Sequence, residues 1–381
     1  MNDDSLRGTR ASMFTDVRMS GFRCFEDLRL KDLGRVNLMV GENGAGKTSV
    51  LEGVRLLRAG GNPLALLASA LERGEYDSEE DDDGSSERAA ILRFAFHGRH
   101  GQGGERFRIE GHEAEGPSRT IDAEIVDVSA NDPEAPLLGA PVGARGEIEW
   151  HGMFPDWAIR LRLDEGSASV DVPLEWSRGS ARRLRLMAPR WDARPRAEVP
   201  VFLRANGVDD AVLGQLWDRV AATPLKDDVI GALQHLEGSI RDIDLRSDPR
   251  LPFRSRVAVR IENGESSSAP IGSFGEGVAW LFALALGAAA TPSRLLLVDD
   301  IDAELHHRVM AHMWAMVIET ARRRDLQVFA TTHSIDCITA LRRVCAQTPT
   351  VADEIRVVRL VKGGHAGITF TADELDTAIE G

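Results

Sequence analysis

The sequence predicts an α/β protein with a mixed, mostly parallel central sheet, an antiparallel β layer and a helical insertion. Two observations lead to this prediction. The apolar run 36–40 stops at a glycine, and from Lys47 the apolar residues follow a helical period, which is the pattern of a buried parallel strand and the helix after it. Strand and helix patterns then alternate over residues 295–343, the order that is typical of a parallel sheet.

The other elements follow from periodicity and turn residues. Residues 89–174 alternate in short stretches between Gly, Pro, Asp and Asn, which is typical of an antiparallel layer. Expected strands lie within 13–40 and at 91–96, 121–128, 158–163, 257–261, 295–298, 327–330 and 355–360. Expected helices lie at 47–59, 64–73, 209–222, 225–243, 277–290, 305–323 and 335–343.

Charge is distributed unevenly along the chain. The net charge of −14 argues against a surface that is coated with nucleic acid throughout, although it leaves room for a local basic groove. Residues 75–87 carry eight acids and no base, a block that usually forms a disordered loop. Residues 176–198 hold seven arginines and two tryptophans, which could follow a phosphate backbone or form a solvated or partner-binding surface.

The length of 381 residues exceeds what one simple core usually holds, so we expect three segments. Residues 1–73 begin the core, 74–254 form the inserted β and helical region, and 255–381 complete the core. No apolar run approaches the roughly 18 residues that span a bilayer, and the first residues lack the apolar stretch of a secretory signal. The three cysteines have neither metal nor disulfide spacing. We expect a soluble, cytoplasmic protein without a membrane partner.

Residues 41–48 (GENGAGKT) fit the pattern G-x-x-x-x-G-K-[ST] at every position. Its glycines let backbone N–H groups curl around phosphates, and the following helix points its positive end at the same anion. Lys47 can bind the β- and γ-phosphates, and Thr48 can offer its hydroxyl to Mg²⁺. A glycine-rich hairpin would not explain the flanking strand and helix. The pattern predicts a P-loop for ATP and Mg²⁺, formed by Gly41, Glu42, Asn43, Gly44, Ala45, Gly46, Lys47 and Thr48.

Three further segments complete the predicted site. The apolar run 295–298 ends in Asp299, which would hold Mg²⁺, and in Asp300, which would orient or deprotonate the attacking water. His333 follows the strand 327–330, at the sheet edge where ligands of α/β proteins bind, and could donate to the γ-phosphate. A helix start follows a serine and small residues, which predicts a second anion site at Ser273, Gly275, Glu276 and Gly277.

In this order, the motifs resemble ATPases of the ABC, SMC and RecF head class, most closely the RecF-like and OLD-like AAA ATPases of prokaryotes. The resemblance covers residues 13–60 and 255–381. Residues 22–25 (FRCF) resemble the family's FRxF element, which implies Arg23 as a nucleotide contact. Residues 273–277, 299–302 and 330–334 resemble the signature, the Walker B with its D-loop, and the histidine switch. The resemblance implies a homodimer around two ATP molecules, each between the P-loop of one chain and the signature of the other.

Several departures from the family qualify these expectations. Asp300 stands where the family has a glutamate, and the shorter side chain predicts slow turnover. No glutamine is placed as a Q-loop, and the region between the half-sites has no heptads for coiled-coil arms. The remainder after His333 is short for a nuclease domain, so we expect any nuclease to be a separate chain.

Two functions remain open from the sequence. The first is an ATPase switch that acts with a separate effector, a nuclease or toxin, in anti-phage defence. The second is a RecF-like ATPase of DNA repair that touches DNA through the arginine-rich segment. A transporter ATPase fits less well, because the insertion is large and no Q-loop is evident.

Overall fold

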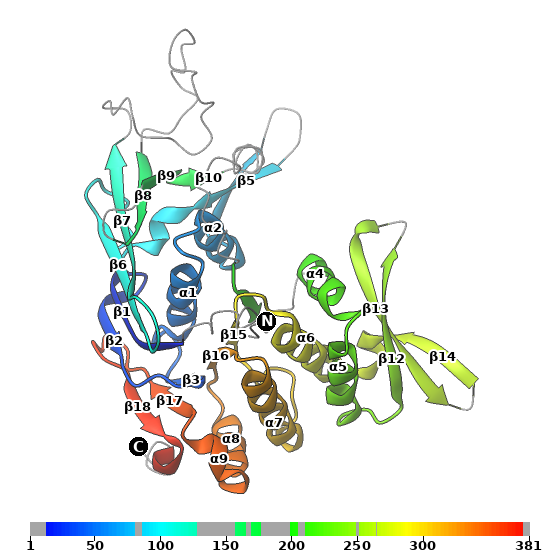
Figure 1. The fold of residues 1–381 in the computed structure, drawn as a ribbon. Helices are drawn as coiled ribbons and strands as arrows, with labels where there is room; N and C mark the ends of the chain where they lie inside the picture. Colours follow the sequence, from blue (N-terminus) through cyan, green and yellow to red (C-terminus); the bar gives the residue numbers. More distant parts are fainter. Residues whose placement is uncertain are drawn as a thin grey trace, which may run out of the picture.

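The computed structural model describes residues 13–80, 86–127, 157–164, 169–176, 199–204, 210–248, 251–263 and 265–375. The arginine-rich run 178–196 lies outside these residues. The described parts form two large sheets, two smaller ones and the helices between and beside them (Figure 1).

The central sheet has the strand order β11-β15-β16-β3-β17-β18. Its strands are β3 (Val36–Val40), β11 (Val201–Arg204), β15 (Leu295–Asp299), β16 (Gln327–Thr331), β17 (Ile355–Arg359) and β18 (Ile368–Thr371). All neighbours pair in parallel except β17 and β18. The predicted fold class is confirmed, because the run 36–40 and the alternation after residue 295 both enter one parallel sheet.

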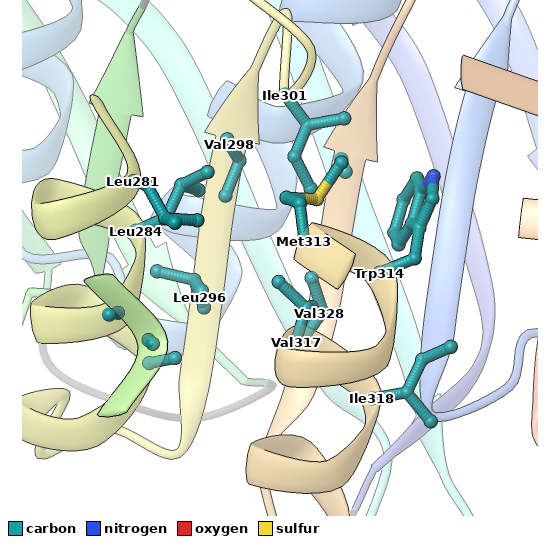
Figure 2. Close-up of a cluster of buried hydrophobic side chains, with 14 of the residues drawn as sticks. Leu281, Leu284, Leu296, Val298, Ile301, Met313, Trp314, Val317, Ile318 and Val328 are labelled. Atoms are coloured by element: carbon teal, nitrogen blue, oxygen red, sulfur yellow. The ribbon is translucent and has the colours of Figure 1, made fainter. Parts of the chain in front are cut away.

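Helices cover both faces of this sheet. They are α1 (Lys47–Arg58), α2 (Pro63–Glu72), α4 (Asp210–Val220), α5 (Leu225–Gln234), α6 (Glu276–Ala290), α7 (His307–Arg323), α8 (Ile335–Gln347) and α9 (Pro349–Ala352). Leu281 of α6 and Met313 of α7 pack onto Leu296 and Val328 of the strands (Figure 2). The next residue along β15, Leu297, faces the opposite core, which also contains residues of α1. Strands buried on both faces explain why the sequence shows continuous apolar runs there.

The antiparallel layer has the order β2-β1-β6-β7-β8-β9. Its strands are β1 (Phe14–Phe22), β2 (Phe25–Leu30), β6 (Arg106–Glu113), β7 (Arg119–Asp127), β8 (Trp157–Leu163) and β9 (Ser169–Pro173). One face is apolar and buried, whereas the other carries ion pairs across neighbouring strands, such as Arg106–Glu124 at 2.7 Å and Arg160–Asp171 at 2.8 Å. Since β6 to β9 extend the sheet that β1 and β2 begin, part of the inserted region is continuous with the core.

Three local predictions were wrong. At both ends of the acidic block the chain forms strands, because β4 (Tyr76–Glu80) and β5 (Ser86–Ile91) pair antiparallel and β10 (Glu175–Trp176) extends the pair; residues 81–85 lie outside the described residues. The expected strand 91–96 is instead the short 3-10 helix η1 (Leu92–Ala95), whose carbonyls accept hydrogen bonds from Arg23. Helix α5 ends at Gln234, since the Glu237 side chain accepts from Ser239 and forms a turn before the next strand.

A third antiparallel group contains β12 (Ile240–Asp248), β13 (Leu251–Asn263) and β14 (Glu265–Pro270). It lies beside α4 and α5 and extends away from the central sheet (Figure 1). The chain then passes through the 3-10 helix η3 (Ile271–Phe274) directly into α6. This hairpin group therefore positions the start of α6.

The buried side chain of Gln327 joins the two large sheets. Its Oε1 accepts a hydrogen bond from Phe14 N at 3.0 Å, and its Nε2 donates to Phe14 O at 2.8 Å and Gly34 O at 2.9 Å. Only 1% of Gln327 is exposed. The amide thus satisfies three backbone groups, of which the N–H and the carbonyl of Phe14 are buried.

We predict that Gln327→Met lowers the free energy of unfolding by about 2–4 kcal/mol, because the similar volume is kept while buried backbone groups lose their partners. Urea denaturation measures the change. The matched control is Gln347→Met at the exposed end of α8, which should change stability by less than about 0.5 kcal/mol. Equal stabilities of the two variants would contradict the role of Gln327.

Candidate nucleotide site

The loop between β3 and α1 is open toward solvent. Gly44 and Gly46 have φ of 79° and 96°, and Gly46 is the N-cap of α1. A Cβ at Gly41, where φ is 144°, would lie 2.4 Å from the carbonyl oxygen of Leu360, so glycine is required there. Lys47 lies against the loop, and its Nζ donates to Gly41 O at 2.7 Å and to Glu42 O at 3.1 Å. The loop thus surrounds the Lys47 ammonium and presents the start of a helix, as anion binding requires.

The carboxylate of Asp299 lies beside this loop. Thr48 Oγ1 donates to its two oxygens at 2.9 and 3.1 Å, and Thr331 Oγ1 donates at 2.7 Å. These contacts form because β16 lies between β3 and β15, so that all three strands end at one edge. The structure therefore brings together the two residues, Thr48 and Asp299, that the sequence assigned to magnesium.

Asp300 and His333 lie at the same edge. His333 Nδ1 is 3.4 Å from Asp300 Oδ1, and the side chains are 64% and 40% exposed respectively. The backbone of Asp300 has φ of 52°, and its N–H donates to Thr331 Oγ1 at 2.8 Å. The left-handed conformation of Asp300 changes the direction of the chain after β15. The Asp300 carboxylate is therefore exposed, whereas the Asp299 carboxylate keeps its hydrogen bonds to Thr48 and Thr331.

The segment 273–277 lies next to the loop that follows Asp299. Trp280 Nε1 donates to Ile301 O at 2.9 Å, and a Cβ on Gly277 would lie 2.8 Å from Glu304 O. Ser273 is exposed in η3, and Gly275, not a serine, caps α6. Within the described residues, no hydrogen bond or ion pair joins 273–277 to 41–48. The structure does not bring the predicted signature onto the P-loop of its own chain.

Arg23 forms ion pairs within its own chain, and its role as a nucleotide contact stays a prediction. Its side chain is 4% exposed, and its NH1 donates to Glu75 at 2.6 and 2.7 Å, while Nε lies 3.0 Å from Glu52. Glu52, which is 1% exposed, also pairs with Arg73 and Arg204. An arginine held between two carboxylates stabilises the junction of α1, the β1–β2 turn and β4. The ion pairs that hold Arg23 were not evident from the FRxF resemblance.

Several residues of the site were missed by the sequence analysis. Thr331 links Asp299 to the Asp300 backbone, and Thr332 Oγ1 donates to Asp302 at 2.6 Å. The pair of threonines before His333 was the available signal. Arg73 contacts Ser49 Oγ at 3.1 Å. Burial acts to lower the pKa of Arg73, but Glu52, Glu75 and Asp299 raise it above its ordinary value.

The donor set fits a magnesium ion. A hydroxyl and a carboxylate converge at the start of α1, and hard oxygen ligands of this kind are the ones Mg²⁺ takes, with phosphate oxygens completing its shell. A P-loop after β3, an aspartate pair after β15 and a histidine after β16 define a P-loop NTPase fold of the ABC-type head class.

The comparison with protein families agrees with this class. Residues 16–132 match the family model "AAA domain", and residues 188–336 match "AAA domain, putative AbiEii toxin, Type IV TA system". Both matches are to AAA domains, one in each part of the chain, and neither alone covers half of it. The two matches contain the P-loop and the Asp299–His333 half of the site respectively.

Similar solved structures include SMC heads. The SMC head domain from Thermotoga maritima is 15% identical, with a TM-score of 0.43 over 94% of this chain and 98% of that one. An SMC head bound to the C-winged helix domain of ScpA is 14% identical, with a TM-score of 0.44 over 95% of this chain and 99% of that one. An SMC head with an extended coiled coil, bound to the C-terminal domain of ScpA derived from Pyrococcus furiosus, is 12% identical. Its TM-score is 0.46 over 96% of this chain and 98% of that one. Curated proteins yield no match. None of the helices in the described ranges is both long and apolar enough for a membrane span.

We predict that chemical modification of one cysteine, Cys24, blocks nucleotide binding at the P-loop. Its exposed Sγ lies 3.8 Å from Ser49 Oγ and 2.7 Å from where a Gly46 Cβ would be. N-ethylmaleimide should modify this thiol alone in the native protein, and binding of a fluorescent ATP analogue should fall by about ten-fold or more because the adduct crowds the loop.

The other two thiols are protected by burial. Burial raises the pKa of Cys345 to about 11 and that of Cys337 beyond its ordinary range, which leaves little reactive thiolate. Mass spectrometry should count one adduct in native protein and three in denaturant. Cys24→Ala protein should bind the analogue with or without the reagent. Full nucleotide binding by wild-type protein labelled at Cys24 would contradict the prediction.

Proposed function

We propose that the chain hydrolyses ATP, with Mg²⁺, as a head-to-tail homodimer and acts as the switch of a separate effector protein in anti-phage defence. The observation that supports the chemistry best is the convergence of Thr48, Asp299, Asp300 and His333 on one sheet edge beside the P-loop. This edge is where ligands of parallel sheets bind.

Each residue has a role in this proposal. Backbone N–H groups of 41–46 and the Lys47 ammonium bind the phosphates; Lys47 exchanges its present carbonyl partners for phosphate oxygens. Thr48 and Asp299 hold Mg²⁺, which supplies neutralisation of phosphate charge when it is bound. Thr331 keeps Asp299 oriented through its 2.7 Å hydrogen bond, so the carboxylate needs little reorganisation.

Asp300 and His333 act on the attacking water and the terminal phosphate. Asp300 orients the water and accepts its proton, while His333 donates a hydrogen bond to the γ-phosphate. Oxygen of water bonds to the γ-phosphorus, the bond to the bridging oxygen breaks, and ADP and phosphate leave. Both side chains are exposed in the single chain, so the site is not closed. We expect slow turnover, because the aspartate reaches less far than a glutamate would.

A second copy of the chain would close the site. Ser273, Gly275 and Glu276 are exposed at the start of α6, where backbone N–H groups can receive phosphate. Ile335, which follows the His333–Ser334 pair, is 51% exposed although it is apolar. An apolar side chain beside the reacting groups is covered if a partner packs there. The half-sites 41–48 and 273–277 then complete each other across the dimer.

The defence role rests on a different observation. Residues 188–336, which contain the proposed signature, Asp299 and His333, match a family described as a type IV toxin–antitoxin AAA domain. Because the description names a toxin–antitoxin system, which has two components, we propose that the chain acts with a separate effector protein. The DNA-repair alternative depends on the arginine-rich run 178–196, which lies outside the described residues.

We predict that two inactive variants complement each other. Lys47→Ala removes the phosphate cation, and Ser273→Arg blocks the exposed signature. Each alone should lose ATP hydrolysis, whereas an equal mixture should regain about a quarter of wild-type activity, because about half of the dimers then contain one complete site of two. Phosphate release measures the rate.

The control uses the same substitutions in another combination. A mixture of Lys47→Ala with the double variant Lys47→Ala, Ser273→Arg contains no intact P-loop and should stay inactive. If the first mixture also stays inactive while both variants are folded and exchange subunits, the composite site is contradicted.

A further inference from the structure

A cavity of about 470 Å³ lies at the opposite end of the central sheet from the nucleotide site. The C-terminal ends of α6 and α7 and the turns that begin β15 and β16 surround it, together with α4 and the start of α5. Figure 1 shows α4, α5, α6 and α7 grouped on one side of the sheet. The strands end at the P-loop edge, so the cavity remains accessible when that edge is covered.

The charge of this cavity contrasts with the rest of the chain. Its lining contains four arginines and one acid, although the chain as a whole carries a net charge of −14. The lining charges are Arg219, Arg294, Arg323, Arg324 and Asp325. The neighbouring acids are already shared, since Asp325 pairs with Arg35 and Arg294 at 3.2 Å, and Arg323 pairs with Asp228 at 3.1 Å. Arg324 is exposed and has no acidic partner within the described ranges. The cavity therefore attracts negative charge.

The floor of the cavity is apolar. Leu225, Ala288–Ala290, Pro292 and Leu326 line it between the arginines. The helices α4, α6 and α7 end beside the cavity and α5 begins there, so the helix ends by themselves do not select one kind of anion. Guanidinium groups at the rim can pair with carboxylates in a planar, bidentate manner, and the apolar floor suits a ligand that also carries apolar side chains. This arrangement fits acidic side chains at the rim and apolar side chains on the floor.

We propose that this cavity is a docking site for an acidic segment of a partner protein, in which carboxylates alternate with apolar residues. The volume accommodates a few side chains, as small binding pockets do. The site contacts the far ends of α6 and α7, whose first residues lie at the signature and after the D-loop. A segment bound here can therefore remain attached whether or not the ATP edge is occupied.

A labelled decapeptide of alternating glutamate and leucine tests this proposal by fluorescence anisotropy. The wild-type chain should bind it with an affinity that falls as salt is added, because rim ion pairs are screened. The double variant Arg219→Glu, Arg324→Glu should weaken binding by about ten-fold or more. The control Arg343→Glu, an exposed residue of α8 outside the lining, should stay within about two-fold.

Three outcomes would overturn the proposal. The first is no binding of the peptide at low salt. The second is equal binding by the double variant and the wild type, or an equal loss in Arg343→Glu. The third is displacement of the peptide by sulfate far beyond the effect of sodium chloride at the same ionic strength, since this would identify a site for a compact oxyanion. Thermal denaturation of each variant ensures that only folded proteins are compared.

Discussion

The carboxylate of Asp299 is the group on which the nucleotide site depends. It accepts hydrogen bonds from Thr48, at the start of α1, and from Thr331, at the end of β16, while belonging to β15 itself. One carboxylate therefore fixes the relative positions of three neighbouring segments. The constraint requires a parallel sheet, because only then do β3, β15 and β16 end at the same edge.

The same hydrogen bonds explain why the carboxylate of the next residue, Asp300, is exposed. Thr331 accepts a hydrogen bond from the Asp300 backbone, which turns the chain with φ of 52° and presents the second carboxylate to solvent beside His333. The engaged aspartate suits a metal, and the free one suits a water molecule. The two aspartates have the same side chain, so their different roles come from the backbone turn at Asp300, which separates the directions of the two carboxylates.

Local motifs were predictable because their chemistry lies in contiguous residues. The P-loop pattern and the apolar run before Asp299 can be recognised from neighbouring residues alone, without knowledge of any distant contact. Predictions failed where distant contacts decide. The segment expected as a strand at 91–96 is a 3-10 helix, and two of its carbonyls accept hydrogen bonds from Arg23, which Glu75 and Glu52 also hold. The acidic hairpin β4–β5 likewise depends on backbone pairing, which charge composition does not reveal.

The central claim is that the P-loop is one half of a site that a second copy completes. The most direct test is the molar mass of Asp300→Asn protein in solution, measured by light scattering with Mg²⁺ and with or without ATP. Without the proton acceptor, the variant should still bind ATP but should not hydrolyse it, so that ATP stays bound. We predict that ATP shifts the mass from that of one 41.6 kDa chain to twice that value, and that Ser273→Arg in the same background prevents the shift. A mass that does not change while ATP is bound would contradict the account.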